Sequence, residues 1–453
     1  MQSYDLVIVG AGSGNMLPSA DFDGWRIAIV ETDRFGGTCL NRGCIPSKMF
    51  IYAADVAEHV RHAGRYGLSA ELTGVDWPAI RDRVFGRIDP IHDDAVAYRR
   101  RSGVDVYLGE ARFVAPKVLQ VDGERLEAER IVLAAGSRPA LPDLPGLETV
   151  PFHTSDTVMR LDRLPASMLV LGGGYIGAEM SHVFGALGTA VTILHRGDSL
   201  LNAHDHDVRA RFTELYRQRF DVRLQTSVER VEPSSAGLVA HLIDGAGTRT
   251  TVEAETMLVA IGRVPNSDRL DLAAGGLTVD EHGHIAVDDC NATAVPGVWA
   301  LGDTANHFQL KHLANAEARL VRHNLLHPDE PKAGRFTVVP SAVFADPQIG
   351  SVGATEDQLR AQGRPYITAT RDYSTTAYGW AMEDTTSFAK VIADPTTRLL
   401  LGAHILGPQA ATLVQALVQA MCLGTTVDQL AHDVIYIHPA LTEVVENALL
   451  QLD

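Results

Sequence analysis

The chain has 453 residues, 46% of them hydrophobic and 21% charged, which describes an ordinary globular protein too long for a single hydrophobic core. Its formal net charge of −17 argues against nucleic acid or an anionic membrane surface as a partner. Its four cysteines are too few for a secreted disulfide framework, and they fit a reducing cytoplasmic location.

The first predicted strand is Leu6–Val9, a continuous apolar run typical of a parallel strand covered on both faces. It leads into residues 10–15, Gly-Ala-Gly-Ser-Gly-Asn, a dinucleotide fingerprint whose third glycine is replaced by Asn15. The first two glycines allow a tight turn and the close approach of a pyrophosphate, whereas the third mainly lets the helix pack closely on the strand. Pro18 follows early, so we expect the first helix to be short or distorted.

A second predicted strand, Arg26–Val30, ends in Glu31. This acid lies 19 residues beyond Gly12, the spacing at which a carboxylate accepts hydrogen bonds from ribose hydroxyls. Together the two strands, the glycine turn and the acid predict a site for the adenosine diphosphate part of a dinucleotide.

Two cysteines five positions apart follow, in the run Gly36–Lys48, which reads Gly-Gly-Thr-Cys-Leu-Asn-Arg-Gly-Cys-Ile-Pro-Ser-Lys. In a regular helix their Cα atoms would lie roughly 8.6 Å apart, whereas a disulfide tolerates at most about 6.8 Å. If Cys39 and Cys44 bond, the segment between them must be an irregular loop, which Gly43 permits, and a helix begins near Pro46. This arrangement places Cys44 at a helix N-terminus.

A thiolate at a helix N-terminus is stabilised by unpaired backbone N–H groups, which lower a cysteine pKa below its free value of about 8.5. The spacing therefore suits a pair that is reduced and reoxidised. Two ordinary buried cysteines, or half of a metal site, are the alternatives. Zinc sites usually use tighter cysteine pairs with a second pair elsewhere, which this sequence lacks, so we expect no metal.

The run Gly36–Lys48 resembles the redox-active segment of the FAD-dependent pyridine nucleotide-disulfide oxidoreductases. The resemblance implies an α/β fold with two Rossmann-like dinucleotide-binding domains, one for FAD and one for NADPH, and a C-terminal α+β dimerisation domain. The expected parts are the FAD-binding domain, the NADPH-binding domain, a central FAD-binding part and the dimerisation domain, at residues 1–148, 149–266, 267–334 and 335–453.

Helical patterning covers residues 46–62 and 77–101, and the three arginines Arg99–Arg101 suggest a solvated helix face. Residues 131–139 then resemble the strand and glycine turn that close the family's first domain on the flavin. Several prolines between residues 142 and 151 mark a connection.

A second copy of the nucleotide-binding unit begins at the predicted strand Met168–Leu171 and continues into Gly172–Gly177, here with all three glycines. After the next strand, Ala190–Leu194, the expected acid is missing and His195-Arg196 stand in its place. A guanidinium suits the 2′-phosphate of NADP, which a carboxylate would repel, so we expect NADPH in preference to NADH. A surface arginine without a role is the alternative.

The C-terminal third contains further family-like segments. Residues 258–266 resemble the exit from the nicotinamide domain, and residues 298–303 resemble the strand that returns to the flavin. Residues 338–344 and 388–392 read as strands, and both halves of residues 400–453 read as helical. The most apolar long window, 399–424, is interrupted by polar residues, so we expect a buried or interface helix there and no membrane span.

His438-Pro439 and Glu443 precede the last apolar helix. A histidine at the mouth of a helix is more often structural than catalytic, but the spacing His-Pro-x-x-x-Glu matches the family's acid/base motif. Histidine titrates near neutral pH, and a carboxylate partner fixes its tautomer and raises its basicity.

The resemblance assigns roles residue by residue. The expected catalytic residues are Cys39, next to the substrate, Cys44, next to the flavin, and the pair His438 and Glu443, supplied by the other subunit of a homodimer. Lys48 is expected to pair with Glu179 beside the flavin, Tyr175 to gate the nicotinamide pocket, Asp303 to bond the ribityl chain and Lys311 to contact the flavin through its backbone. The remaining expected cofactor contacts are Gly10, Gly12, Ser13, Gly14, Glu31, Thr38, Ala111, Gly136, Gly172, Gly174, Ile176, Arg196 and Gly262.

The sequence predicts the reaction class better than the substrate, a small disulfide. Asn15, the irregular segment after it and the chain end soon after Glu443 are most similar to the branch of the family that reduces mycothione, the disulfide of the sugar-linked thiol mycothiol. The dihydrolipoamide dehydrogenase and glutathione reductase branches are the alternatives. The first commonly uses NAD and an acid where Arg196 stands, and the second carries another arginine where this chain has Asn202.

Two other possibilities are disfavoured. Mercuric reductase would need a further cysteine pair at the C-terminus, which this chain lacks. A flavin-binding protein without turnover should have lost the cysteine pair or the His–Glu pair, and both are intact. Cys290 and Cys422 match no motif, and we expect them to be buried thiols.

Overall fold

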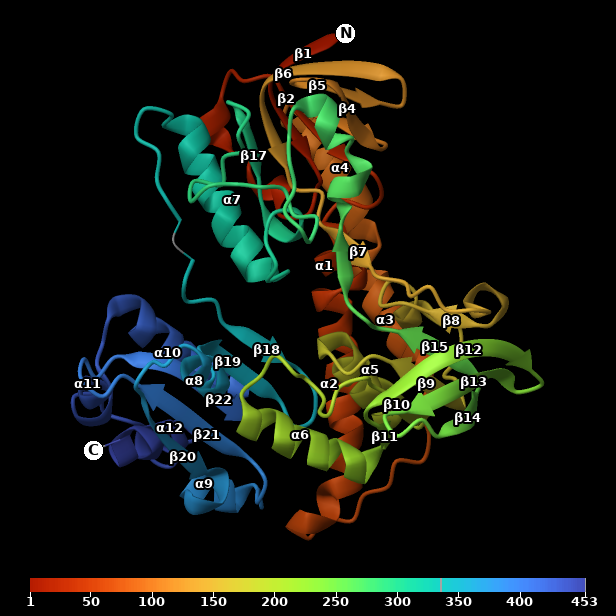
Figure 1. Ribbon diagram of the computed structural model, residues 1–453, viewed down its shortest axis with the longest axis vertical. Coiled ribbons are helices and arrows are strands. Elements are labelled where there is room, and N and C mark those ends of the chain that lie inside the picture. Colours follow the sequence, from red (N-terminus) through yellow and green to blue (C-terminus); the bar gives the residue numbers. More distant parts are fainter. Residues whose placement is uncertain (335, 453) are drawn as a thin grey trace. The chain divides into compact units, whose positions relative to one another are not determined.

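Five β-sheets and their helices make up the computed structural model, which describes residues 1–334 and 336–452 (Figure 1). They form two compact units. The first unit comprises residues 1–49, 79–140 and 262–336, and the second comprises residues 50–78, 141–261 and 337–453. The α/β class expected from the sequence is confirmed, whereas the four-part division at residues 148, 266 and 334 stays a prediction.

The first unit is built on a sheet whose parallel strands run in the order β3-β2-β1-β6, with β17 on the far side of β6. These strands are β3 (Asp105–Leu108), β2 (Ile27–Glu31), β1 (Gln2–Val9), β6 (Glu124–Leu133) and β17 (Val298–Ala300). The hairpin β4 (Ala111–Ala115) and β5 (Val118–Val121) continues the sheet antiparallel from the first half of β6.

The second half of strand β1, Leu6–Val9, is buried on both faces, as its apolar sequence predicts. Leu6 and Ile8 belong to one hydrophobic cluster, and Val7 and Val9 belong to the other. Helix α7 (Lys311–Leu326) contributes Val321 to the cluster of Leu6. The other helices with residues in this unit are α1 (Gly37–Arg42), α2 (Cys44–His62), α3 (Trp77–Ile88) and α4 (Pro90–Arg101). A two-stranded pair, β7 (Ser137–Pro139) and β16 (Arg263–Pro265), completes it.

The second unit contains a second parallel sheet, with strand order β11-β10-β9-β15-β8. Its strands are β11 (Asp221–Arg223), β10 (Ala190–Leu194), β9 (Ser167–Leu171), β15 (Thr256–Val259) and β8 (Phe152–His153), and its helices are α5 (Tyr175–Ala186) and α6 (His206–Arg219). A three-stranded antiparallel sheet accompanies it, formed by β12 (Thr226–Ser234), β13 (Gly237–Asp244) and β14 (Arg249–Ala254).

The two parallel sheets carry the same glycine turn. Gly10 has a φ of +102°, and a Cβ there would lie 2.1 Å from the carbonyl oxygen of Ala134. Gly172 has a φ of +123°, and a Cβ there would lie 2.2 Å from the carbonyl oxygen of Ala260. In both sheets, therefore, only glycine fits where the first strand ends against the neighbouring parallel strand.

The C-terminal part of the second unit is an antiparallel sheet in the order β18-β19-β22-β21-β20. The strands are β18 (Ser341–Val343), β19 (Ile349–Gly353), β20 (Ile367–Asp372), β21 (Phe388–Ala393) and β22 (Leu400–Leu406). Helix α10 (Ala410–Leu423) packs on β19 and β22, and helix α12 (Thr442–Leu449) packs on β20 and β21 (Figure 1). Three shorter helices are α8 (Glu356–Ala361), α9 (Ala377–Ala381) and α11 (Val427–His432).

One predicted helix is wrong at its start. Leu400–Leu406, expected to be helical, forms strand β22, and the helix of this window begins only at Ala410. All seven residues of β22 are buried, so both faces of the strand are covered, and His404 is its one polar residue. A continuous apolar run of this length does not distinguish a central strand from a buried helix.

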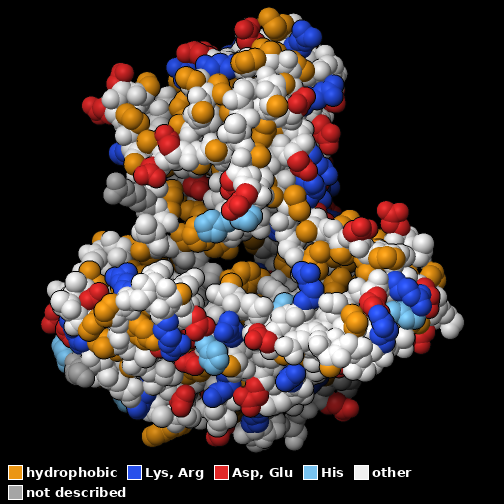
Figure 2. All heavy atoms as spheres, viewed as in Figure 1, with side chains coloured by type: hydrophobic (Ala, Val, Ile, Leu, Met, Phe, Trp, Pro, Cys, Tyr) orange, Lys and Arg blue, Asp and Glu red, His pale blue; other side chains and the backbone are white. Residues whose placement is uncertain are grey.

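The surface and the helices show two further features. Acidic, basic and hydrophobic side chains are mixed over the face drawn in Figure 2, so the net negative charge is not gathered into one patch there. None of the helices in the described part of the chain combines the length and the apolar character that a membrane crossing needs.

A buried ion cluster joins the nucleotide-type sheet to the antiparallel sheet within the second unit. Lys390 on β21 is 1% exposed, and its Nζ lies 2.7 Å from Asp205, 2.6 Å from Asp207 and 2.5 Å from Glu356. These three carboxylates are arranged as metal ligands could be, but the ammonium of Lys390 lies among them. Burial alone would raise the pKa of Asp205, yet Lys390 and the backbone N–H of Glu356 hold it below its usual value.

Replacing Lys390 by methionine should strongly destabilise the second unit. The change leaves the carboxylates of Asp205 and Glu356 without their cation in a buried position, which typically costs about 3–5 kcal/mol. Urea unfolding should show this loss, whereas Lys332→Met, at an exposed position, should stay within about 0.5 kcal/mol of the parent protein. Equal midpoints for the two variants would contradict a stabilising role of the cluster.

Candidate functional site

The two cysteines lie on consecutive helices with one residue between them. Cys39 is in α1, Gly43 has an irregular backbone with φ −130° and ψ −119°, and Cys44 is the first residue of α2. A Cβ on Gly43 would lie 2.9 Å from the carbonyl oxygen of Thr38, so the backbone at Gly43 lies tightly against the start of α1. The expected loop between the cysteines is therefore wrong in form, but Cys44 does lie at a helix N-terminus.

Cys39 and Cys44 are thiols that are not joined in a disulfide in this structure, and they are hydrogen-bond partners. This interaction is the main cause of a raised pKa at Cys39; burial raises that pKa further, and the charge of Lys311 lowers it. Protons leave such a coupled pair in two separate steps. The pair therefore favours a state with one thiolate and one thiol.

The first glycine turn lies directly against the cysteine helix. Gly36 N–H donates to the carbonyl oxygen of Ala11 at 3.0 Å, and a Cβ on Gly37 would lie 2.8 Å from the Cα of Gly12. Ala11 N–H donates to Glu31 Oε2 at 2.7 Å. Glu31 therefore supports the turn itself, a contact that the expected ribose interaction did not anticipate.

The segment after the turn is held by an arginine from α4. The expected first helix is reduced to a single 3-10 turn, Gly14–Met16, which confirms the prediction of a short helix. Arg99 donates from Nε to Asn15 Oδ1 at 2.7 Å, and further to the backbone oxygens of Asn15 and Pro18. The expectation of a solvated face is therefore wrong for Arg99, whose burial lowers the pKa of its guanidinium.

The carboxyl end of β17 places an acid near the same turn region of the first unit. Asp303 Oδ2 accepts a hydrogen bond of 2.6 Å from Ser137 Oγ, which in turn accepts one of 2.8 Å from Arg263 Nε. Gly136, with a φ of +68°, accepts from Thr304 Oγ1 at 2.9 Å through its carbonyl oxygen. Ser137 and Arg263 were missed by the sequence analysis, because nothing in their local pattern shows that β7 and β16 pair.

The second glycine turn is completed by a neutral histidine. Gly173 N–H donates to His195 Nδ1 at 3.2 Å, and burial, with a contribution from Arg196, lowers the pKa of His195. The imidazole therefore stays uncharged and keeps an acceptor nitrogen toward the turn. Arg196 is exposed beside it. Gly174 and Ile176 flank Tyr175, the first residue of α5.

Tyr175 packs against a buried histidine. The rings of Tyr175 and His204 meet edge to face with centroids 5.4 Å apart, and His204 Nδ1 lies 3.1 Å from Ser351 Oγ. Tyr175 itself is 38% exposed. The antiparallel sheet therefore supports the position of Tyr175 through His204, a link that spans distant parts of the sequence.

His438 and Glu443 form a direct pair in the second unit. His438 Nδ1 lies 2.7 Å from Glu443 Oε1, and Ala440 N–H donates to Glu443 Oε2 at 3.2 Å. The hydrogen bond with His438 is the main reason why the pKa of Glu443 is lowered. The imidazole is 72% exposed, so its second nitrogen is open to solvent.

The remaining predicted residues are spread over both units. Thr38 lies in α1, Ala111 begins β4 and Lys48 lies in α2, one turn beyond Cys44. Glu179 lies in α5 of the second unit, where its Oε1 accepts from Phe344 N–H at 3.0 Å. Gly262, with a φ of +126°, precedes β16. The pairing of Lys48 with Glu179 stays a prediction.

The two other cysteines differ from expectation. Cys422, near the end of α10, is exposed, and Cys290 is half-buried, so the prediction of buried thiols is wrong. Cys422 lies on a helix face that the apolar sequence pattern alone did not distinguish from the packed one.

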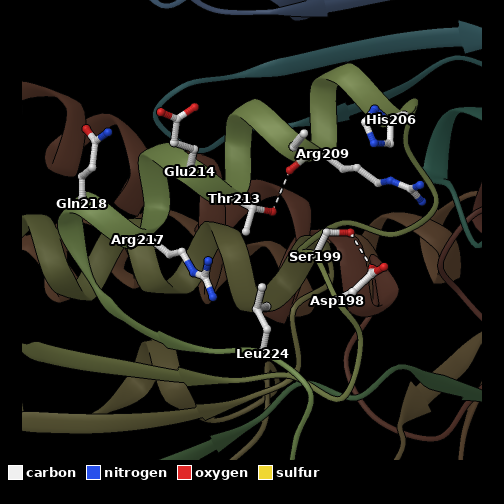
Figure 3. Close-up of a pocket in the computed structure, with 10 residues that line it drawn as sticks. Asp198, Ser199, His206, Arg209, Thr213, Glu214, Arg217, Gln218 and Leu224 are labelled. Carbon is white, nitrogen blue, oxygen red and sulfur yellow. Dashed lines mark hydrogen bonds between the residues drawn. The ribbon is translucent and has the colours of Figure 1, made fainter. Parts of the chain in front are cut away.

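A surface pocket of about 520 Å³ lies along α6 in the second unit (Figure 3). Arg209 and Arg217 line it from the helix, and Ser199 and Leu224 line it from the segments beside the helix. Figure 3 shows Thr213 bonded to the backbone of Arg209, at 2.6 Å. None of the predicted site residues lines this pocket.

Known protein families match most of the length of this chain. The Pyridine nucleotide-disulphide oxidoreductase family matches residues 4–318, and its dimerisation domain matches residues 339–449. The chain belongs to the pyridine nucleotide-disulphide oxidoreductase family. It is accordingly an FAD-dependent enzyme that uses a nicotinamide nucleotide, and its C-terminal domain supports a homodimer.

Several members of the family cover nearly all of the chain. Mycothione reductase of Mycobacterium tuberculosis (strain CDC 1551 / Oshkosh) is 45% identical over 100% of both chains. Dihydrolipoyl dehydrogenase of Halobacterium salinarum is 35% identical over 98% of this chain and 95% of its own. The solved structure of the HOCl-induced flavoprotein disulfide reductase RclA from Escherichia coli matches with a TM-score of 0.87 and 26% identity, over 99% of this chain and 100% of its own.

Both glycine turns of this family member have room for a pyrophosphate. A Cβ on Gly12 would meet only Gly37 Cα, at 3.8 Å, and a Cβ on Gly174 would meet no atom within 4 Å among those described. The first turn has Glu31 behind it, Asp303 lies in the same unit, and the exposed cation Arg196 follows the second turn. These residues fit FAD at the first turn and NADPH at the second.

Acid should weaken the second unit of the enzyme through His204. Burial, helped by His404 and opposed by Asp205, lowers the pKa of His204 to about 4. The unfolded chain takes up this proton near pH 6.5. Between pH 6.5 and 4 the unfolded state therefore binds more protons than the folded state. As the pH is lowered through this range, the free energy of unfolding decreases by at most about 3 kcal/mol. Burial lowers the pKa of His404 as well, with the same sign.

Urea unfolding at several pH values between 4 and 7 measures this dependence. We expect His204→Gln to flatten the loss of stability toward acid, whereas His206→Gln, at a neighbouring exposed position, should leave it as in the parent protein. A parent-like slope in His204→Gln would show that the histidine does not carry the effect.

Proposed function

We propose that this enzyme reduces mycothione, the disulfide of mycothiol, with NADPH as the source of electrons. The observation that carries the proposal is the thiol pair Cys39–Cys44, which the turn at Gly43 brings together against the dinucleotide-type turn at Gly12. The choice of substrate rests on the full-length similarity to the Mycobacterium tuberculosis enzyme and on Asn15 in the first turn.

The first unit provides a place for FAD. Glu31, at the end of β2, supports the glycine turn, and the carboxylate of Asp303 is oriented by Ser137. When bound, FAD supplies a ring that accepts electrons from a reduced nicotinamide and returns the cysteine disulfide to the dithiol. Lys48, on the same helix as Cys44, is the cation that we expect beside that ring.

The reduced cysteine pair then carries the thiol chemistry. The Cys39 thiolate attacks one sulfur of the substrate disulfide, forms a mixed disulfide and releases one thiol. The Cys44 thiolate attacks Cys39, breaks the mixed disulfide and releases the second thiol. The substrate gains two electrons and two protons, and the cysteine pair is left as a disulfide.

The pair His438–Glu443 supplies the protons that the departing thiolates need. We propose that His438 of the partner subunit donates to each departing thiolate, so that the active site is shared between the two subunits. Glu443 bonds Nδ1 and leaves Nε2 of the same ring exposed for the substrate. A carboxylate partner also stabilises the imidazolium that forms during the exchange.

We also propose a cytoplasmic location for the enzyme, because the reducing cytoplasm keeps thiol pairs reduced.

A second candidate function is dihydrolipoamide oxidation, since a dihydrolipoyl dehydrogenase is among the full-length relatives. That reaction uses the same cysteine pair in the opposite direction. The nucleotide site favours the first function, because His195-Arg196 replace the acid that would bind the ribose of NAD.

A substrate panel tests the proposed function. The purified enzyme should oxidise NADPH with mycothione at least tenfold more efficiently, in kcat/KM, than with oxidised glutathione, and should show little oxidation of dihydrolipoamide with NAD. Cys39→Ser and Cys44→Ser should each abolish turnover, because the first removes the sulfur that attacks the substrate and the second removes the sulfur that resolves the mixed disulfide. Faster dihydrolipoamide oxidation than mycothione reduction would favour the second candidate.

Nucleotide preference should depend on Arg196. Arg196→Ala removes the cation expected at the 2′-phosphate, so KM for NADPH should rise about 10-fold or more while KM for NADH changes little, as for the loss of a charge-assisted hydrogen bond. Arg217→Ala, on α6, is the matched control and should leave both values unchanged. Equal effects on the two nucleotides would remove Arg196 from the phosphate site.

A further inference from the structure

Lys311 places a side-chain cation on the first glycine turn. It is the first residue of α7, and its Nζ donates a hydrogen bond of 2.8 Å to Ser13 Oγ. Ser13 Oγ donates at 3.1 Å to Asn315 Oδ1, one turn further along the same helix. Ser13 is 8% exposed and Lys311 is half-buried, so this chain of bonds holds the ammonium against a buried hydroxyl group.

The glycine turn that binds this cation also contacts the helix of Cys39. Gly12 is in contact with Gly37 at the start of α1, as described above, and Cys39 lies two residues further along that helix. All of these residues belong to the first unit. The ammonium of Lys311 therefore lies beside the segment that holds the redox-active pair.

No carboxylate neutralises Lys311 directly. Within residues 1–334 and 336–452 it forms no ion pair, although burial lowers the pKa of its ammonium. The groups that act against this effect are Cys39, Cys44 and Asp303. Asp303, whose carboxylate also accepts a hydrogen bond from Ser137, is the weakest of the three. A half-buried cation is stabilised by nearby negative charge, and the cysteine pair acts on Lys311 more strongly than Asp303 does.

We propose that the ammonium of Lys311 is the charge partner of the Cys39–Cys44 pair and holds its reduced form as a thiolate. This role rests on the proposed function, because it concerns the dithiol state that attacks the substrate. Lys311 acts through charge, as a positioning residue, and takes no part in bond making. The sequence resemblance assigned only its backbone to cofactor contact, so the side chain adds a separate role.

Other charges around the cysteines act alongside Lys311. The N-terminus of α2 at Cys44 contributes the partial positive charge of its unpaired N–H groups. Lys48 lies one turn further along α2, with Nζ 3.4 Å from Ser47 Oγ. Of these cations, Lys311 is the one that acts on Cys39 in opposition to the neighbouring thiol and to burial.

The pH dependence of cysteine alkylation tests the proposal. The holoenzyme is reduced anaerobically, treated with iodoacetamide between pH 5 and 10, and each cysteine is followed by mass spectrometry. In Lys311→Gln the apparent pKa of the Cys39–Cys44 pair should rise by roughly half a unit to one unit, which lowers the alkylation rate at pH 7 about three- to tenfold. Lys311→Arg, which keeps the charge, should restore parent-like behaviour.

Two controls separate a charge effect from a general disturbance. Lys332→Gln removes an exposed lysine of the same unit and should leave the profile unchanged. Exposed Cys422, in the second unit, is an internal reference whose alkylation rate should be the same in every variant. If Lys311→Gln does not fold, Ser13→Ala, which removes the hydroxyl that holds the ammonium, should show a smaller shift in the same direction.

The outcomes distinguish this inference from the proposed function. A parent protein without a low-pKa thiol at Cys39 or Cys44 would overturn both. A parent protein with such a thiol and an identical profile in Lys311→Gln would overturn only the role of Lys311. An identical profile in Ser13→Ala, where Lys311→Gln is not obtained, would overturn it equally.

Discussion

The redox centre depends on a break in the helix at a single residue, Gly43. Gly43 lies so close to the start of α1 that a Cβ would contact the carbonyl oxygen of Thr38. Without this close approach the two cysteines would lie on one continuous helix, where their sulfurs cannot meet. The same break makes Cys44 the first residue of α2, so one backbone feature both brings the thiols together and gives one of them a helix N-terminus.

The second organising constraint is the glycine turn, which appears twice with the same local geometry. At Gly10 and again at Gly172, the backbone has a positive φ and faces the carbonyl oxygen at the end of the neighbouring parallel strand. What surrounds each turn differs: Glu31 supports the first, and the neutral ring of His195 supports the second. The two turns thus share one backbone geometry, and the side chains that support them differ.

Much of this fold follows from local sequence, and the exceptions share a physical cause. Apolar runs, glycine turns and the helix start near Cys44 can be predicted from the sequence because they depend on neighbouring residues. The strand Leu400–Leu406 was not, because burial on both faces removes the periodicity that separates strand from helix. The hydrogen bonds from Arg99 to Asn15 and from Ser137 to Asp303 could not be predicted either, since both join residues far apart in sequence.

The contact between Arg99 and Asn15 has a consequence for how the protein is made. The two residues are 84 positions apart, so the first dinucleotide turn stays incomplete while the ribosome is still adding the intervening helices. Strand β17, which pairs with β6, arrives later still, from residue 298 onward. The amino-terminal part of the first unit is therefore synthesised well before the segment from residue 298 onward that completes its sheet.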